Sequence, residues 1–332
     1  MSRVAIIGAG SWGTAIAQLL ADNGFEVNLW ALEPEVVSCI NKDHKNPIYL
    51  KDSVLSPRIV ATSSFEEVIE DVDFCAIVTP SQFLRQTVEK IKPFDKKSLP
   101  YVICSKGSEH DTGMLASEVL FDVLGNMDRI AVLSGPTHAE EVIKKTPSAA
   151  TCACIDIELA AHLANCFSND YFRVYTTDDV SGVELCATFK NVIAIAVGVS
   201  YGLGFGDNTA ATLITRGVAE MSRMVEVCNG KMQTCLGLAG IGDMVVTCMS
   251  RHSRNRRFGQ DYLSCGKTLD NFKADTKMIV EGAVAACNLQ TLEEKHNIEL
   301  PITNAIYEMI YKNGDVKQVA NSLFNRPLKE EF

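Results

Sequence analysis

A glycine-rich turn near the N-terminus constrains the fold of this chain more than any other feature of its sequence. Gly8, Gly10 and Gly13 have the spacing G-x-G-x-x-G, between a short apolar run at residues 4–7 and a helix-like segment at residues 14–23. In a strand–turn–helix, the first glycine permits the tight turn, the second lets the backbone approach a pyrophosphate, and the third allows close helix packing. The helix N-terminus adds N–H donors and partial positive charge. A bare tight turn is the alternative, but this context favours dinucleotide binding.

Apolar runs rich in β-branched residues alternate with amphipathic segments through the first half of the chain, which is typical of βαβ units around a buried parallel sheet. The runs lie at residues 4–7, 27–30, 74–78, 101–104, 130–133, 149–155 and 171–175. Helix-like segments lie at residues 14–23, 35–41, 81–91, 115–124, 139–144 and 158–168. From Asp179 onward the patterns become long and helical, at residues 180–198, 209–228, 280–296 and 303–312. The sequence therefore predicts an α/β fold, with a Rossmann-type parallel-sheet domain at residues 1–179 and an all-helical domain at residues 180–332.

The charge balance argues against nucleic acid as a partner. The chain has 332 residues, with 31 Lys and Arg against 41 Asp and Glu, a formal net charge of −10. A protein that binds a phosphate backbone would need a basic patch on this acidic surface. Hydrophobic residues make up 47% of the chain, which is enough to bury a core and excludes a disordered protein.

The cysteines and the apolar runs indicate where the protein functions. The 12 cysteines are scattered through apolar segments, where they are expected to be buried thiols in a reducing compartment. The sequence has no C-x-x-C pair and no H-E-x-x-H motif, so we expect no metal site. The N-terminal apolar run is too short for a signal peptide, and the other runs are too short or too interrupted to span a bilayer. We therefore expect a soluble cytoplasmic protein without membrane insertion, and a homodimer on general frequency.

The end of the second predicted strand bears on the choice of dinucleotide. An acid at this position accepts hydrogen bonds from the ribose hydroxyls of NAD, whereas a basic residue holds the 2′-phosphate of NADP. Glu33 lies at about the ~20-residue offset expected for the ribose acid, and no Arg or Lys stands at this strand end. NAD is therefore weakly favoured. Because Pro34 follows, Glu33 could equally be a solvated residue at the start of a helix.

Small polar turns follow three of the predicted strands. In an open parallel sheet, ligands bind at the carboxyl ends of the strands. The turns are Thr79-Pro80-Ser81, Ser105-Lys106-Gly107 and the segment from Ser134 to Glu140. Lys106 could place a cation beside cofactor or substrate, although a solvated loop lysine is an equal alternative. His138 could act as an acid but stays unassigned, because a lone loop histidine is more often structural.

A lysine lies within the most apolar of the predicted helices. Lys190 and Asn191 interrupt the run at residues 185–197, which is apolar on nearly all sides and is therefore expected to be buried. Burial of a lysine disfavours its ammonium form and makes it usable as a general acid or base. The alternative is that Lys190 extends from the helix to water. The adjacent polar residue favours a functional role.

A basic window follows a glycine-rich loop in the second half. The loop at residues 237–243 ends in Asp243, and residues 251–257 carry the densest positive charge of the chain. Ser253, Arg254 and Asn255 combine a hydroxyl, a guanidinium and an amide, which suits a phosphate dianion better than a carboxylate. A polybasic nucleic-acid patch is the alternative, but no aromatic residue occurs among the basic ones before Phe258.

Together these motifs resemble those of the bacterial-type NAD(P)-dependent glycerol-3-phosphate dehydrogenases. The resemblance covers essentially the whole chain in the same order. The motifs are GAGSWGTA (8–15), SKG (105–107), SGPTHAEE (134–141), KNVIAIAVG (190–198), GLAGIGDMVVTC (237–248), SRNRRFG (253–259) and VEG (280–282). The resemblance implies the interconversion of sn-glycerol 3-phosphate and dihydroxyacetone phosphate with NAD or NADP, usually supplying phospholipid synthesis.

The resemblance also implies roles for individual residues. Lys190 matches the proton acceptor of the family. The residues that match the substrate shell are Lys106, Gly135, Thr137, Lys190, Asp243, Ser253, Arg254 and Asn255. Besides the glycine turn with Gly8, Gly10 and Gly13, the residues that match cofactor contacts are Ser11, Trp12, Lys106, Ala139, Arg254, Ile279 and Glu281. Two positions depart from the family pattern: Thr137 replaces the usual Ser and keeps the hydroxyl, and Leu32 replaces a common Arg or His.

These roles predict a mechanism, and two other functions have to be weighed against it. Arg254 and Asn255 would hold the phosphate, Lys190 would handle the C2 hydroxyl proton, and Asp243 would orient Lys190 or bind a substrate hydroxyl. Lys106, Lys190 and Arg254 are expected to converge on one cleft between the domains. The alternatives are a related two-domain hydroxyacid dehydrogenase, which would need a carboxylate clamp, and a non-catalytic dinucleotide-sensing protein, which would not need a buried lysine.

Overall fold

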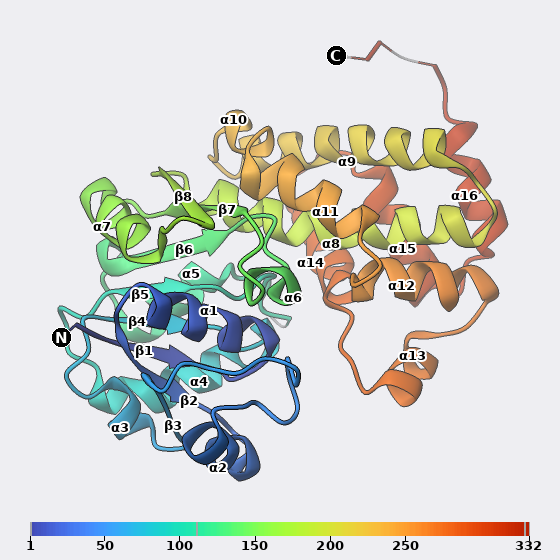
Figure 1. The fold of residues 1–332 in the computed structure, drawn as a ribbon. Helices are drawn as coiled ribbons and strands as arrows, with labels where there is room; N and C mark the ends of the chain where they lie inside the picture. Colours follow the sequence, from blue (N-terminus) through green and yellow to red (C-terminus); the bar gives the residue numbers. More distant parts are fainter. Residues whose placement is uncertain (1, 111, 329, 332) are drawn as a thin grey trace. The chain divides into compact units, whose positions relative to one another are not determined.

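The computed structural model describes residues 2–110, 112–328 and 330–331, which form two compact units (Figure 1). The first unit takes in the described residues up to Glu109 and Met114–Glu184. The second contains those from Leu185 onward, together with the described residues of the segment 110–113. The boundary that we expected between two domains, after residue 179, stays a prediction. It lies one residue before helix α8, whose first residues, up to Glu184, belong to the first unit.

The first unit is built on an eight-stranded sheet with the order β3-β2-β1-β4-β5-β6-β7-β8. Its strands are β1 Arg3–Ile7, β2 Glu26–Trp30, β3 Ile59–Thr62, β4 Phe74–Ile77, β5 Tyr101–Ile103, β6 Ile130–Ser134, β7 Ser148–Ala153 and β8 Phe172–Thr177. The order changes direction between β1 and β4, which pair in parallel. Ligands of open α/β sheets bind at such a switch point.

The sheet departs from the expectation of uniformly parallel strands in two respects. β7 pairs with β6 antiparallel, and β8 runs parallel to β7, so these two strands oppose the other six. The sequence pattern also missed β3, which pairs with β2. Hydrophobic periodicity marks where strands lie but carries little information on their direction. The α/β class is nevertheless confirmed.

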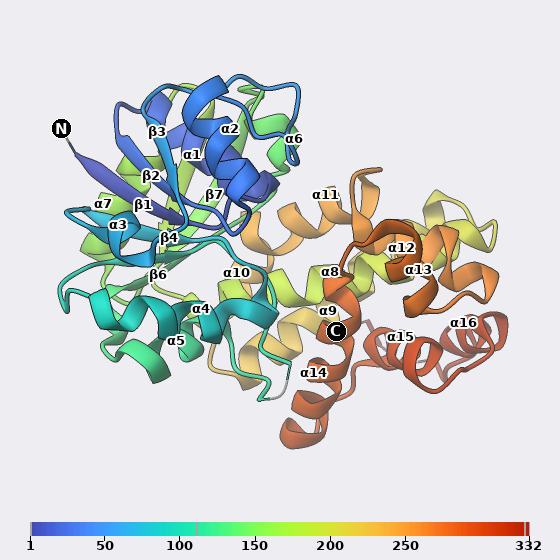
Figure 2. The same ribbon diagram turned by 90° about the horizontal axis from the view of Figure 1, so that it is seen from below.

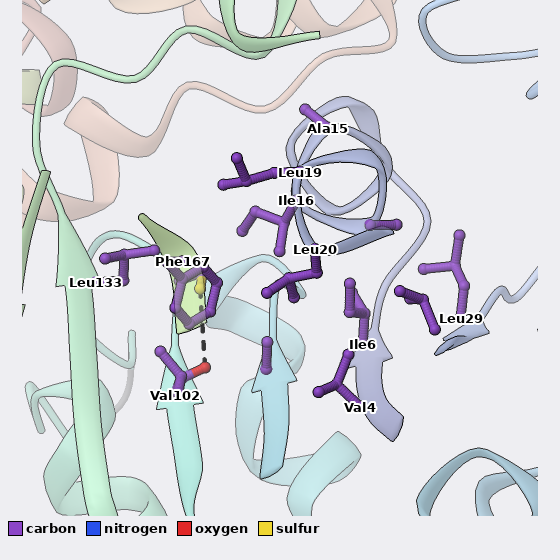
Figure 3. Packing of buried hydrophobic residues seen from close by; sticks show 14 of the residues in the cluster. Val4, Ile6, Ala15, Ile16, Leu19, Leu20, Leu29, Val102, Leu133 and Phe167 are labelled. Atoms are coloured by element: carbon purple, nitrogen blue, oxygen red, sulfur yellow. Dashed lines mark hydrogen bonds between the residues drawn. The ribbon is translucent and has the colours of Figure 1, made fainter. Parts of the chain in front are cut away.

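Helices cover both faces of this sheet (Figure 2). They are α1 Ser11–Asp22, α2 Pro34–Asp43, α3 Phe65–Ile69, α4 Leu84–Ile91, α5 Ala116–Leu124, α6 Ala139–Val142 and α7 Ile157–Phe167. α1 contacts α6 and α7, while α4 contacts α3 and α5. Figure 3 shows Ile16, Leu19 and Leu20 of α1 packed among strand residues such as Ile6, beside Phe167. These side chains are fully buried, so the core fixes α1 on the strand end that precedes it.

In the second unit, every helix or strand that the structure describes from Leu185 onward is a helix. Its helices are α8 Val180–Gly202, α9 Asp207–Val227, α10 Met232–Cys235, α11 Asp243–Met249, α12 Arg254–Asp261, α13 Leu269–Thr276, α14 Glu281–His296, α15 Pro301–Tyr311 and α16 Val316–Phe324. The all-helical prediction is confirmed, although α10 to α13 and α16 were not predicted as helices. These are short helices, four to nine residues long, and short segments have weak periodicity.

α8 is the central helix of this unit because its neighbours approach its backbone closely. A Cβ atom on Gly259 of α12 would lie 2.2 Å from the carbonyl oxygen of Ile195, and one on Gly198 of α8 would lie 2.1 Å from that of Arg256. A Cβ on Gly282 of α14 would meet the Asn191 carbonyl at 2.6 Å. Only glycine permits this spacing, and it sets the polar residues of the three helices side by side.

Two stretches of helix are long and apolar enough to cross a membrane by length and composition, although we expected the apolar runs to be too short or too interrupted to do so. They are Val180–Gly202 and Met232–Met249. The apolar window of α8 is wholly buried inside the protein, as in the core helix of a globular domain. The second stretch is interrupted at Gly240, whose backbone is not helical.

All 12 cysteines are free thiols, and burial raises the pKa of the Cys152 thiol to about 12.

Candidate functional site

The glycine turn connects β1 to α1 with three different backbone requirements. Gly8 has a φ of +116°, and its Cβ would press against the backbone of Val78 at 3.2 Å. A Cβ on Gly13 would lie 1.8 Å from the Gly8 carbonyl oxygen, so helix and strand end are in direct backbone contact. A Cβ on Gly10 would meet nothing within 4 Å. The first and third glycines are therefore required for packing, whereas the second faces open space.

The residues at this turn fit an anionic dinucleotide. Gly10 is the N-cap of α1, no side chain caps the helix, and its first turn contains no acidic residue. The first backbone N–H groups of a helix have no intrahelical acceptor and attract anions. The indole Nε1 of Trp12 is buried and has no hydrogen-bond partner in the described part of the chain. The turn therefore offers several N–H donors beside the open face of Gly10.

The three turns after strands β4, β5 and β6 meet, as expected from their position in the sheet. The Ser105 hydroxyl donates to the Thr79 carbonyl, and a Cβ on Gly107 would lie 3.3 Å from the Ser81 hydroxyl. The Lys106 ammonium donates to the Gly135 carbonyl at 3.0 Å. Lys106 is therefore held at the sheet edge, which argues against a freely solvated loop lysine.

Of the remaining residues of the third turn, Thr137 contacts the same carbonyl group and Ala139 belongs to the helix that follows. The Thr137 hydroxyl donates to the Gly135 carbonyl at 3.1 Å, so that oxygen accepts from both Lys106 and Thr137. Ala139 is buried and begins α6. His138 precedes it at the N-cap position, and its side chain makes no cap hydrogen bond.

Both interpretations of Glu33, at the end of β2, are compatible with the structure. Glu33 is the N-cap of α2, with Pro34 following, as the helix-start interpretation requires. Its side chain makes no cap hydrogen bond and lies at the carboxyl end of β2, as the ribose interpretation requires. The neighbouring Leu32 is 71% exposed, so this strand end presents an apolar side chain and a carboxylate.

Lys190 is buried in α8 and does not extend to water. It is 5% exposed, and its Nζ lies 2.7 Å from Oδ1 of Asp243 and 3.2 Å from the hydroxyl of Thr247. Asp243 is 1% exposed, at the start of α11. The carboxylate stabilises the ammonium form, which opposes the desolvation expected from burial alone. The alternative in which Lys190 extends to water is therefore wrong, and the contact with Asp243 is the one expected if Asp243 orients Lys190.

The glycine-rich segment before Asp243 is a helical turn rather than the expected loop. Leu238–Gly242 forms a single π-helical turn, labelled η4, that is interrupted at Gly240. A Cβ on Gly240 would lie 2.1 Å from the carbonyl oxygen of Cys235. The close contact requires glycine, and it brings α11 to the position from which Asp243 reaches Lys190.

Asn255 connects three helices through its side-chain amide. Its Nδ2 donates to Oδ1 of Asn191 at 2.9 Å, and its Oδ1 accepts from the Gly282 backbone N–H at 2.9 Å. It is 6% exposed. We expected this residue to hold phosphate. These two contacts are structural and use one of its two amide hydrogens, so in this conformation Asn255 braces α8 against α12 and α14.

The basic window begins α12. Ser253 is the N-cap, and its hydroxyl accepts from the Arg256 backbone N–H at 3.2 Å. Arg254 follows, with its side chain 46% exposed and its guanidinium 3.5 Å from Glu281 at the start of α14. Glu281 also lies 3.5 Å from Nδ2 of Asn191, and half-buried Ile279 lies two residues before it. The structure thus connects Arg254 and Glu281 with Asn191, the residue that follows Lys190 on α8. Convergence with Lys106 stays a prediction.

Two further residues contact the candidate site but were not identified from the sequence. Thr247 binds both Lys190 and Asp243, and its position one helical turn after Asp243 was a usable signal. Asn46 contacts the glycine turn from the segment between α2 and β3. No motif or periodicity marks it.

Comparison with known proteins identifies the family. The N-terminal model of NAD-dependent glycerol-3-phosphate dehydrogenase matches residues 3–160, and the C-terminal model matches residues 179–321. The chain is 41% identical to a glycerol-3-phosphate dehydrogenase [NAD(P)+] of Chlorobium limicola, over 99% of both chains. It is 42% identical to that of Thermobifida fusca, over 100% of this chain and 99% of the relative. The crystal structure of glycerol-3-phosphate dehydrogenase from Coxiella burnetii superposes with a TM-score of 0.93 at 36% identity, covering 98% of this chain and 99% of the other. This chain belongs to the NAD-dependent glycerol-3-phosphate dehydrogenase family.

Proposed function

We propose that this chain interconverts sn-glycerol 3-phosphate and dihydroxyacetone phosphate by hydride transfer with NAD or NADP, and so supplies glycerol 3-phosphate for phospholipid synthesis. The observation that carries the proposal is the buried Lys190–Asp243 pair, in a chain that both halves of the family model match. A protein that only senses a dinucleotide has no need for this pair.

The cofactor would be held mainly by backbone groups of the first unit. The bound nicotinamide supplies or accepts the hydride. The N–H groups of Gly10, Ser11 and Trp12 would bind the pyrophosphate, because they belong to an uncapped helix N-terminus. Ala139, Ile279 and Glu281 would complete the contacts.

Lys190 would exchange the proton of the C2 oxygen. As an ammonium it would donate to the ketone oxygen during reduction, where negative charge develops, and it would accept the hydroxyl proton during oxidation. Asp243 and Thr247 hold its Nζ at 2.7 and 3.2 Å and so restrict its direction. A restricted proton donor loses less entropy on reaching the transition state.

The phosphate would be bound by Arg254, whose guanidinium is half exposed, and by backbone N–H groups at the start of α12. Ser253 and the remaining amide hydrogen of Asn255 would complete this shell. In the first unit, Lys106, Gly135 and Thr137 would bind the glycerol oxygens, with Lys106 and Arg254 also reaching the cofactor.

Three finer assignments belong to the same proposal. NAD would be preferred to NADP, because Leu32 and Glu33 offer no cation for a 2′-phosphate. The enzyme would be cytoplasmic, as its cysteine-rich core favours a reducing compartment. It would function as a homodimer, the commonest assembly of soluble enzymes.

The test is the loss of absorbance of NADH, and separately of NADPH, on addition of dihydroxyacetone phosphate. We expect oxidation of both and a higher kcat/KM with NADH. Oxidation only with a 2-keto acid would favour a hydroxyacid dehydrogenase. Binding of NADH without turnover of either substrate would favour a sensing protein. Sedimentation of the purified protein tests the dimer.

A further inference from the structure

Asn46 is a buried amide that joins the segment after α2 to the glycine turn. It is 1% exposed. Its Nδ2 donates to the carbonyl of Ala9 and to the hydroxyl of Thr14, both at 2.9 Å. Its Oδ1 accepts from the backbone N–H groups of Ile48 at 3.1 Å and Tyr49 at 3.0 Å. The mechanism above does not use this residue.

These four contacts satisfy the whole hydrogen-bonding capacity of the amide and fix its orientation. An asparagine side chain has two N–H donors and an oxygen with two lone pairs. If the amide were reversed, its NH2 group would face the N–H groups of Ile48 and Tyr49, and its oxygen would face the Ala9 carbonyl. The residues at 46–49 therefore act as a clamp that presents two donors to the turn.

The clamp determines the direction of the peptide group that faces the pyrophosphate position. Ala9 and Gly10 share a trans peptide plane, in which the C=O and the N–H point in opposite directions. The Ala9 carbonyl is turned toward Asn46, and the Thr14 hydroxyl also donates to it at 3.3 Å. The Gly10 N–H is therefore turned away from the clamp, and a Cβ on Gly10 would meet only open space.

We propose that Asn46 is a positioning residue of the cofactor site, which holds the Ala9–Gly10 peptide so that its N–H faces the pyrophosphate. The inference rests on the proposed function, because it assigns a role within the dinucleotide site. A fixed peptide dipole binds an anion better than one that must reorient, since no ordering is required on binding.

The first experiment compares two asparagine variants. Asn46→Ala should raise the Kd of NADH, measured by fluorescence, by about tenfold, the effect expected when a buried carbonyl loses its donor. The kcat with dihydroxyacetone phosphate at saturating NADH should stay near that of the wild type. The control is Asn41→Ala, because Asn41 also bridges backbone groups, bonding both the N–H and the C=O of Ala61, but it does not touch the turn. The Kd of NADH for Asn41→Ala should equal that of the wild type.

A second variant tests the same peptide without substituting any residue of the clamp itself. Thr14→Val keeps the buried volume and removes the hydroxyl that bonds Ala9 and Asn46. It should weaken NADH binding in the same direction by a smaller factor. The double variant should weaken it by less than the product of the two factors, because both side chains act on one carbonyl.

The outcomes separate three cases, with all variants measured well below their unfolding midpoints. If Asn46→Ala lowers the midpoint but leaves the Kd of NADH unchanged, Asn46 is structural and the inference is wrong. If Asn46→Ala does not fold, the inference is overturned when Thr14→Val binds NADH with the Kd of the wild type. If the wild type does not bind NADH, the proposed function fails instead.

Discussion

The two units of this protein place functional groups by different means. In the first unit the groups are backbone N–H donors and loop side chains at one edge of a sheet, and glycine turns hold them there. In the second unit they are side chains from helices that approach α8 within backbone contact. Backbone groups need only a defined turn, whereas a buried ammonium needs a partner from elsewhere in the chain. The second site therefore depends more on tertiary packing than the first.

The largest effect should follow from removing the side-chain chemistry of the second unit. Lys190→Ala should lower kcat by about 10²–10⁴-fold, because it removes the group that exchanges the proton. NADH binding should survive if the backbone turn of the first unit holds the cofactor. Turnover and fluorescence titration measure the two effects separately. Near-normal turnover would contradict the assignment, and loss of NADH binding in a folded variant would break the contrast between the units.

Arg254→Ala should have the next largest effect, and among the parts of the substrate this effect should fall on the phosphate. The KM for dihydroxyacetone phosphate should rise by about 10–100-fold, the loss of a charge-assisted hydrogen bond. The KM for unphosphorylated dihydroxyacetone should change much less. Arg257→Ala is a matched control, since Arg257 lies on the same helix and pairs with Asp261 instead. An equal rise for both ketones would count against a phosphate role.

A glycine pair tests the first unit. Gly10→Ala should leave the unfolding midpoint nearly unchanged, because its Cβ meets nothing, but should raise the Kd of NADH about tenfold by occupying the approach to the pyrophosphate. Gly13→Ala must displace α1, since its Cβ would lie 1.8 Å from the Gly8 carbonyl, so its midpoint should fall as well. Calorimetry with NADH titration distinguishes the two. Equal affinity of Gly10→Ala and the wild type would show that the open face is not the cofactor face.

The smallest effect on catalysis should come from a buried carboxyl in each unit. Glu184 accepts from the backbone N–H and hydroxyl of Ser117 in the first unit, and Glu220 accepts from Ile302 and Thr303 in the second. Burial raises the pKa of each carboxyl to about 7, although these hydrogen bonds oppose it. The folded state then binds more protons than the unfolded state between about pH 5 and pH 7, so stability should fall as pH rises through that range.

The variants Glu184→Gln and Glu220→Gln separate the two contributions. Each should flatten part of this pH dependence, by roughly 1–3 kcal/mol across the range, with little change in kcat. Denaturant unfolding at several pH values measures it. If the units unfold separately, each variant should alter only the transition of its own unit. A wild type whose stability rises with pH across this range would contradict the sign.

Much of the first unit could be predicted because its signals are local. The glycine spacing, the strand-end turns and Lys106 lie within short segments whose positions follow from the order of strands and helices. β3 was missed because it is a short edge strand with exposed Val60. The reversal at β7 was missed because alternation does not encode direction. Asn46 had no signal, because its role depends on a contact 37 residues away.

The sequence by itself determined the fold class, the dinucleotide turn, the burial of Lys190 and the family, because each is written in spacing, periodicity or contiguous motifs. Only the tertiary structure decided the partners of the buried groups. Lys190 meets Asp243 across 53 residues, and Asn255 braces Asn191 across 64. A buried polar group must be satisfied by whatever the packing brings to it, and helix packing depends on close approaches such as those at Gly240 and Gly259. Local patterns carry no record of which distant residue will be there.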